Sequence, residues 1–146
     1  MNDVKLTSTL AFRLGTLGAL VTERFSERLA AHDLKPKHVG LLAVLESGAA
    51  ASQLDIARLM NVAPSLVVSL ADRLEELGAV RRERDPSDRR RQTLTLTAQG
   101  RDLLATCTEA AAEIDAELAE GLGPEQAKAL RTAMRTLATR NGLPAD

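Results

Sequence analysis

Aromatic residues are almost absent from this sequence of 146 residues, which contains two phenylalanines and no tryptophan or tyrosine. Proteins that bind single-stranded nucleic acids stack bases on aromatic side chains, so the composition argues against that class. Cysteine occurs once, as Cys107, which rules out a disulfide within the chain and fits a reducing compartment. The sequence also lacks an apolar run of eighteen residues and a signal peptide. We therefore expect a soluble, cytoplasmic protein that does not bind a membrane.

Residues that perform catalysis or bind metals are also few. The chain has two histidines, His32 and His38, and no cluster of Asp and Glu at metal-ligand spacing. It shows no evident pair of nucleophile and base. We therefore expect no catalytic residue, no metal site and no cofactor, and the protein is not expected to be an enzyme. For both histidines, a position at the surface is favoured over a role in lining a ligand pocket.

The formal net charge of −1 hides an uneven distribution of charge along the chain. Residues 81–91 contain six arginines and three acidic residues, a local charge of +3, whereas residues 92–146 contain five cationic and eight acidic residues, a local charge of −3. Contacts with phosphate depend on local charge. The length fits one domain, so residues 1–146 are expected to form a single unit with one basic patch.

Helical periodicity dominates the first sixty residues. Pro36 suits the first position of a helix that runs to about Glu46, and Ser52 and Gln53 open a shorter helix with a pattern similar to a capping box. Before them, residues 8 to about 31 predict a long amphipathic helix, because apolar side chains recur every three or four positions. These apolar positions are Leu10, Leu14, Leu17, Val21, Phe25 and Leu29.

The segment of residues 61–97 predicts a helix followed by a β-hairpin. Asn61 can adopt the left-handed conformation of a tight turn, and Pro64 favours the start of a helix that ends at Gly78. Two helices that meet across three or four residues form a helix-turn-helix, whose second helix enters the major groove of DNA. Val68 lies on the outer side of that second helix. Its expected core face consists of Leu66, Leu70, Leu74 and Leu77.

The hairpin is strongly basic. Its turn, Asp-Pro-Ser-Asp at residues 85–88, favours chain reversal. A narrow minor groove has an enhanced negative potential that attracts arginine, which makes Arg89 and Arg90 the first candidates for that groove and leaves Arg91 for phosphates. A basic hairpin beside a helix-turn-helix therefore indicates a nucleic-acid reader. The arginines that bracket the turn are Arg81, Arg82, Arg84, Arg89, Arg90 and Arg91.

Two more helices are predicted after the hairpin. Thr97 is placed to cap the first, and Pro124 starts the second after a glycine-rich break. Each carries an apolar stripe that must be buried against another surface, and helices at both ends of a chain are natural material for a dimer interface. The stripes consist of Leu103, Cys107, Ala111, Ile114 and Leu118, and of Ala127, Leu130, Met134 and Leu137.

Taken together, these features resemble the MarR family of bacterial transcription regulators, and the resemblance covers nearly the whole chain. No single motif is specific, but the set is. The matching residues are Asp55-Ile-Ala57, the Pro64-Ser65 helix start, Asp72-Arg-Leu74, Leu77-Gly78, Asp85-Pro-Ser-Asp-Arg-Arg90 and Leu94-Thr-Leu-Thr97 with Gly100.

The resemblance implies a mainly α-helical fold with a small β-hairpin wing. A winged helix-turn-helix unit at residues 33–97 would be flanked by dimerisation helices at residues 1–32 and 98–146. It further implies a homodimer on a pseudo-palindromic double-stranded DNA operator, with Asp88 pairing with Arg73. The protein would act as a repressor, and a small-molecule effector would relieve the repression. We predict DNA contacts from Ser52, Gln53, Pro64, Ser65, Val68, Ser69, Arg73, Arg84, Asp88, Arg89, Arg90 and Arg91.

This sequence departs from the family pattern in the middle of the recognition helix. Val68 and Ser69 stand where the family often has Thr and Arg, so the chain must rely more on DNA shape and on methyl contacts than on bidentate guanine contacts. The usual polar helix cap is replaced by Ala63.

Two alternatives to a ligand-relieved repressor remain at this stage. A winged helix can serve as a protein-interaction module without DNA affinity, and the exposed Val68 would suit that use. A thiol-responsive regulator would have to use Cys107, because the first and second helices, where related oxidation sensors often place the cysteine, contain none. Its place on an apolar stripe favours a buried structural cysteine.

Overall fold

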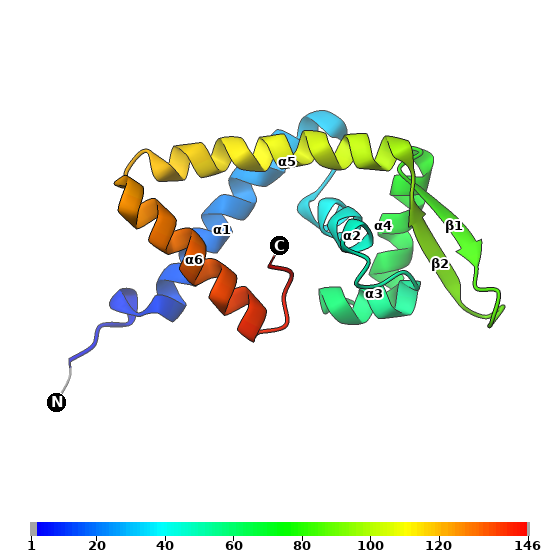
Figure 1. The fold of residues 1–146 in the computed structure, drawn as a ribbon, viewed down its shortest axis with the longest axis horizontal. Helices are drawn as coiled ribbons and strands as arrows, with labels where there is room; N and C mark the ends of the chain where they lie inside the picture. Colours follow the sequence, from blue (N-terminus) through cyan, green and yellow to red (C-terminus); the bar gives the residue numbers. More distant parts are fainter. Residues whose placement is uncertain (1–2, 146) are drawn as a thin grey trace.

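A helix of 22 residues, α5 (Ala98–Ala119), runs along one side of the molecule and joins its two halves (Figure 1). The computed structural model describes residues 3–145. It is mainly helical with one two-stranded antiparallel hairpin, which confirms the predicted fold class. The other elements are η1 (Leu6–Ser8), α1 (Leu10–Leu29), η2 (Ala30–His32), α2 (Pro36–Ser47), α3 (Gln53–Met60), α4 (Pro64–Glu76), β1 (Val80–Arg84), β2 (Gln92–Leu96) and α6 (Pro124–Arg140).

The predicted helix-turn-helix is formed by α3 and α4. Ser52 caps α3 by accepting a hydrogen bond from the backbone N–H of Asp55, and Asn61 ends the helix in the left-handed conformation, with φ of 54°. Pro64 is the first residue of α4, and Ala63 before it provides no side-chain cap. The two helices are bent by 112° from each other, an angle typical of helix-turn-helix units.

The core lies between α2, α3, α4 and the hairpin. The core face that the sequence predicted for α4 differs in detail from the face that α4 buries. Helix α4 buries Val67, Leu70, Ala71 and Leu74, whereas Leu77 is 36% exposed. The predicted leucine stripe was therefore wrong at Leu77. Periodicity alone missed Val67, because α4 is covered on two sides by α2 and the hairpin, which gives it a wider buried face than one stripe.

The hairpin and the start of α5 are closely packed against the end of α4. Gly78 has φ of +71°, which allows the sharp turn into β1, and the Thr97 hydroxyl donates to the Gly78 carbonyl. Thr97 also caps α5 by accepting from the N–H of Gly100 at 3.0 Å, as predicted. A Cβ at Gly100 would lie 2.0 Å from the carbonyl oxygen of Ala79, so no larger residue fits without displacing the backbone.

At the far end, α1 and α6 leave apolar side chains exposed. Helix α6 buries no residue, and the exposed apolar residues of the two helices include Leu10, Leu14, Leu17, Leu130, Met134 and Leu137. Ion pairs of Arg28 with Glu113 and Glu117 fasten α1 to α5. Within residues 3–145, no helix is by itself long and apolar enough to cross a membrane; α3 and α4 reach that length and hydropathy only when joined across their bend.

The two histidines occupy different environments, and the expectation that both lie at the surface was wrong for His38. Its side chain is buried in the first turn of α2, where Nδ1 accepts a hydrogen bond from the N–H of Lys35 at 2.9 Å. Burial lowers the pKa of His38, and the nearby charges of Arg73 and Lys35 lower it further. His32 is exposed, as predicted. Proline at the helix start revealed the helix but not how deeply its third residue is buried.

Candidate nucleic-acid interface

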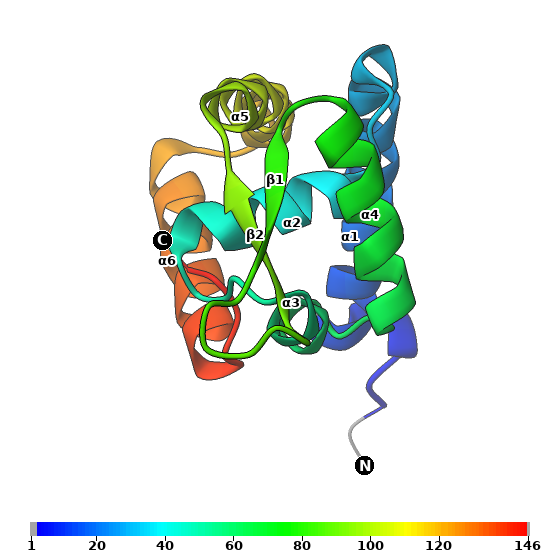
Figure 2. The same ribbon diagram turned by 90° about the vertical axis from the view of Figure 1, so that its right-hand side faces the viewer.

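The hairpin, α3 and the N-terminal half of α4 present one continuous face (Figure 2). The two strands pair from Val80 with Leu96 to Arg84 with Gln92, and the 85–91 loop projects beyond them. An isolated bridge joins Ser52 to Thr93, which attaches the start of α3 to β2 near the loop end of the hairpin. The tip of the wing and the beginning of α4 therefore flank α3 on the same edge of the molecule.

The first half of α4 exposes the side chains that the sequence predicted. Pro64, Ser65, Val68 and Ser69 are all exposed, and Val68 keeps 42% of its surface open to solvent. None of these side chains is charged. Contacts from this helix to a base edge would therefore be apolar or would use hydroxyl groups.

The wing tip is organised by short-range hydrogen bonds. The Asp85 carboxylate accepts from the N–H and the hydroxyl of Ser87, and these bonds lower the pKa of Asp85. The Asp88 carboxylate accepts from the N–H of Arg90 at 3.0 Å and from its Nε at 3.4 Å. Arg90 is nevertheless 93% exposed at its side chain. The tip thus holds its backbone fixed while its arginine side chains extend into solvent.

The predicted pairing of Asp88 with Arg73 was wrong. Arg73 lies in the later half of α4 and pairs with Asp33 at 3.5 Å and with Glu76 at 3.3 Å, whereas Asp88 lies at the wing tip beside Arg90. Residues that are fifteen apart in sequence can meet only if the hairpin folds back over the helix. Here the hairpin extends away from the end of α4 that carries Arg73. Arg73 therefore stays a predicted DNA contact that no contact in the structure supports.

Two of the six hairpin arginines, Arg82 and Arg91, bind to residues outside the hairpin. The guanidinium of Arg82 donates to Gln53 at 3.0 Å and to the Val68 carbonyl at 3.0 Å, and it pairs with Asp72 at 2.7 Å and Glu75 at 3.3 Å. Its side chain is only 18% exposed. In the sequence, Arg82 was one member of the basic cluster and had no role of its own. The alternation of side chains along a strand could have predicted that Arg82 faces inward. It could not have predicted which residues Arg82 binds.

Arg91 forms the second link between the wing and α3. Its guanidinium donates to Ser52 at 3.1 Å and pairs with Asp55 at 3.0 Å. Ser52 is buried, and Gln53 is occupied by Arg82, so the two predicted phosphate contacts of α3 lie within this network. Arg84 and Arg89, by contrast, are exposed and have no ion-pair partner within residues 3–145. Arg90, although 93% exposed at its side chain, pairs with Asp88.

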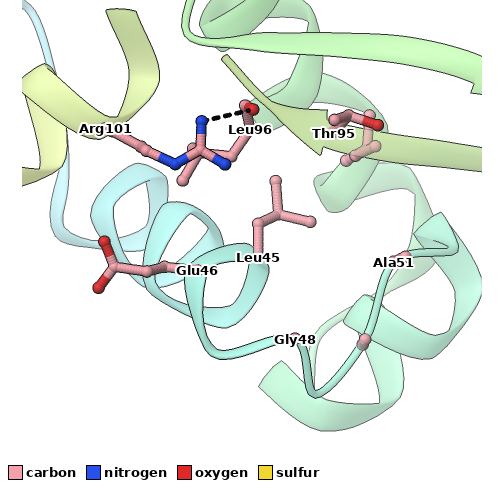
Figure 3. Close-up of a pocket in the computed structure, with 9 residues that line it drawn as sticks. Leu45, Glu46, Gly48, Ala51, Thr95, Leu96 and Arg101 are labelled. Atoms are coloured by element: carbon pink, nitrogen blue, oxygen red, sulfur yellow. Dashed lines mark hydrogen bonds between the residues drawn. The ribbon is translucent and has the colours of Figure 1, made fainter. Parts of the chain in front are cut away.

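A separate hollow of about 230 Å³ lies under the start of α5, next to the end of α2 and β2 (Figure 3). Leu45 and Leu96 supply apolar surface, and Glu46 and Arg101 place opposite charges at its rim. Arg101 donates to the Leu96 carbonyl at 3.5 Å. Among residues 3–145, no group of three His, Cys, Asp or Glu side chains is arranged to hold a metal ion.

Comparison with known proteins identifies the family. The family model described as "MarR family" matches residues 32–91, which include α2, α3, α4 and the wing. A crystal structure of a MarR-family transcriptional regulator from Rhodococcus sp. RHA1 superposes with a TM-score of 0.80 at 26% identity, covering 93% of this chain and 96% of that one. Residues 32–91 thus match the MarR family, and the fold is that of a MarR-family regulator.

Two further proteins extend this comparison. The transcriptional regulator HosA of Escherichia coli O111:H- is 38% identical over 71 residues, 47% of this chain and 53% of HosA, so the match spans about half the length of that curated relative. The S. aureus MepR–DNA complex has the same fold, with a TM-score of 0.71 at 20% identity over 90% of this chain and 98% of that one.

Proposed function

We propose that this chain is a sequence-specific regulator of transcription that binds double-stranded DNA. The supporting observation is that three exposed wing arginines, Arg84, Arg89 and Arg90, share one face with the exposed half of α4. This arrangement offers cations to the phosphates and minor groove and a helix to the major groove. The similar fold of MepR, solved as a complex with DNA, supports the same use of this face.

The active form is a homodimer held by α1, α5 and α6. Eight large apolar side chains of α1 and α6 are exposed, and a large exposed apolar patch marks an interaction surface. Two copies related by a two-fold axis would present two recognition helices, with half-site centres about 10 bp, or one helical turn, apart. The operator is accordingly pseudo-palindromic. In this proposal, residues 33–97 read DNA, and residues 1–32 and 98–146 assemble the dimer.

Repression is the proposed outcome of binding, because a dimer that covers about two helical turns of a promoter excludes polymerase without any further surface. Release from DNA requires an effector that changes the distance between the two winged helix-turn-helix units of the dimer. Such an effector must bind better at one distance between the units than at the other. The hollow beneath the start of α5 is a suitable place for a small molecule with one apolar and one charged part. It lies where the DNA-reading half joins α5, so a bound molecule could alter their relative position.

The test is binding to duplex DNA across a range of salt concentrations. The full chain is titrated with a duplex selected from a random library and with an unselected duplex, each from about 50 to 300 mM salt. A DNA reader binds the selected duplex more tightly, and its affinity falls as salt rises, because arginines release counterions from the phosphates. Binding that ignores sequence and salt, or no binding, would favour the winged helix as a protein-interaction module.

A thiol-responsive regulator receives less support from the site. Cys107 is fully buried in the core, and burial raises the pKa of its thiol. A protonated thiol without solvent access reacts slowly with peroxides, because the thiolate is the nucleophile. Operator release by peroxide in the wild type, and its loss in Cys107→Ser, would reverse this conclusion.

A further inference from the structure

A recess of about 210 Å³ opens on the DNA-reading face, between the start of α3, the start of α4 and the wing. Its apolar wall consists of Leu54, Pro64 and Val68, and Arg90 and Arg91 stand at its rim. Leu54 is 44% exposed and Val68 is 42% exposed. Isolated exposed apolar residues are ordinary, but here they line one hollow on the surface proposed to meet DNA.

The walls of this recess are held in place by the arginines that bind to the protein. Arg82 fixes Gln53, the neighbour of Leu54, and also donates to the backbone carbonyl of Val68. Arg91 fixes Ser52, two residues before Leu54. Both apolar walls therefore belong to backbone segments with defined positions, and a preformed site of this kind costs less ordering on binding than a flexible one.

The same contacts remove the polar groups that usually read bases in this position. A free glutamine can bind adenine through the oxygen and the nitrogen of its side-chain amide, but the Gln53 oxygen already accepts from Arg82. The middle of α4 offers Val68 and the hydroxyl of Ser69. What remains accessible at the recess is an apolar surface beside two cationic groups and the side chain of Gln92.

We propose that this recess is a thymine-reading subsite, whose apolar wall receives the 5-methyl group of a thymine in the major groove. The inference rests on the proposed DNA-binding function. Among the base edges in the major groove, only thymine presents a methyl group, and apolar side chains are its usual contacts. A methyl group is about the size of a water molecule, which occupies roughly 30 Å³ in the liquid, so the recess has room for it and the pyrimidine edge. The exposed guanidinium of Arg90 at the rim complements a nearby phosphate charge.

Deoxyuridine tests this subsite directly, because it differs from thymidine only by the missing methyl group. A duplex selected from a random library with the full chain is prepared again with each thymine replaced singly by deoxyuridine. We expect at least one position per half-site where affinity falls about fourfold, the factor for one buried methyl group. Salt dependence at that position should not change, because no charge is removed.

Three variants assign the methyl effect to the recess. In Leu54→Ala and in Val68→Ala, the ratio of affinities for the thymine and deoxyuridine duplexes should fall towards one. Leu77→Ala is the matched control, because Leu77 is an exposed leucine at the opposite end of α4, and its ratio should stay near the wild-type value. Circular dichroism and thermal unfolding check that each variant is folded.

The possible outcomes separate this inference from the proposed function. If the wild type selects no duplex at all, the DNA-binding function itself fails. If it binds a selected duplex but is insensitive to deoxyuridine at every position, the subsite is refuted and the function stands. A methyl effect that persists in both recess variants would also refute it, because the methyl group would then be read elsewhere.

Discussion

The guanidinium of Arg82 on β1 lies 2.7 Å from the carboxylate of Asp72 on α4. Through this ion pair, and through its bond to the Val68 carbonyl, an arginine of the basic hairpin connects the wing to the recognition helix. The contact also neutralises an acidic group that would otherwise repel phosphate. We therefore predict that Arg82 positions α3, α4 and the wing relative to one another and does not itself contact DNA.

Removing Arg82 should accordingly weaken DNA binding without changing its salt dependence. Arg82→Ala removes hydrogen bonds to charged groups, and we expect the free energy of unfolding to fall by about 2 kcal/mol. Affinity for a selected duplex should fall at every salt concentration by a similar factor. Arg81→Ala is the control, because Arg81 is exposed and pairs within residues 3–145 only with Glu83, two residues further along β1, so stability should change by less than about 0.5 kcal/mol. A flatter salt slope in Arg82→Ala would mean that this arginine contacts phosphate.

The exposed arginines at the wing tip should behave in the opposite way. Arg89→Ala or Arg90→Ala should weaken binding by roughly 1 to 3 kcal/mol and flatten the salt slope by about one unit for each phosphate that the variant no longer neutralises. Folding should not change, because both side chains extend into solvent. Arg140→Ala on α6 serves as a charge-matched control far from this face. If both wing variants bound DNA as tightly as the wild type, the hairpin would be a solvated charged surface and not a DNA contact.

A charge in the exposed stripe of α1 should separate the proposed dimer. Leu14 is 46% exposed, and a glutamate there would be buried without a partner in an apolar interface. We expect light scattering to give a dimer for the wild type at micromolar concentration and a monomer for Leu14→Glu. Leu77→Glu introduces the same charge outside the stripes and should stay dimeric. A monomeric wild type would remove the dimer from the proposal.

Burial of His38 should make stability depend on pH. Since the folded state lowers the pKa of His38 below its ordinary value of about 6.5, the unfolded chain binds more protons near that pH. The free energy of unfolding should therefore fall as pH drops through about 6.5, and be fully retained above it. Protonation would also remove the Nδ1 acceptor that caps α2.

The His38→Gln variant isolates this effect. Glutamine at the third position of a helix can accept from the same backbone N–H but does not titrate. Urea unfolding between about pH 5 and 8 should show a smaller pH dependence in His38→Gln than in the wild type, while His32→Gln, at an exposed site, should match the wild type. An equal slope in all three proteins would assign the pH dependence to other groups.

Local features of the sequence determined the elements and their order. Asn61 and Pro64 specified the turn and helix start, Thr97 the cap of α5, and residues 85–88 the reversal of the hairpin. These signals act through backbone conformation and through hydrogen bonds within three residues, so they can be read without knowing the fold. The exposure of Val68 followed from helical periodicity in the same way.

Only the tertiary structure decided what the charged and buried side chains do. Six arginines look alike in sequence, yet Arg82 and Arg91 bind protein groups that lie 29 and 39 residues earlier in the chain, while Arg89 and Arg90 remain exposed. The burial of His38 likewise depends on how neighbouring elements cover the first turn of α2. Long side chains find partners across the fold, and the distance between such partners is set by the packing of whole elements. Sequence spacing contains no information about that distance, so the division between positioning and DNA-facing arginines appears only after the chain is folded.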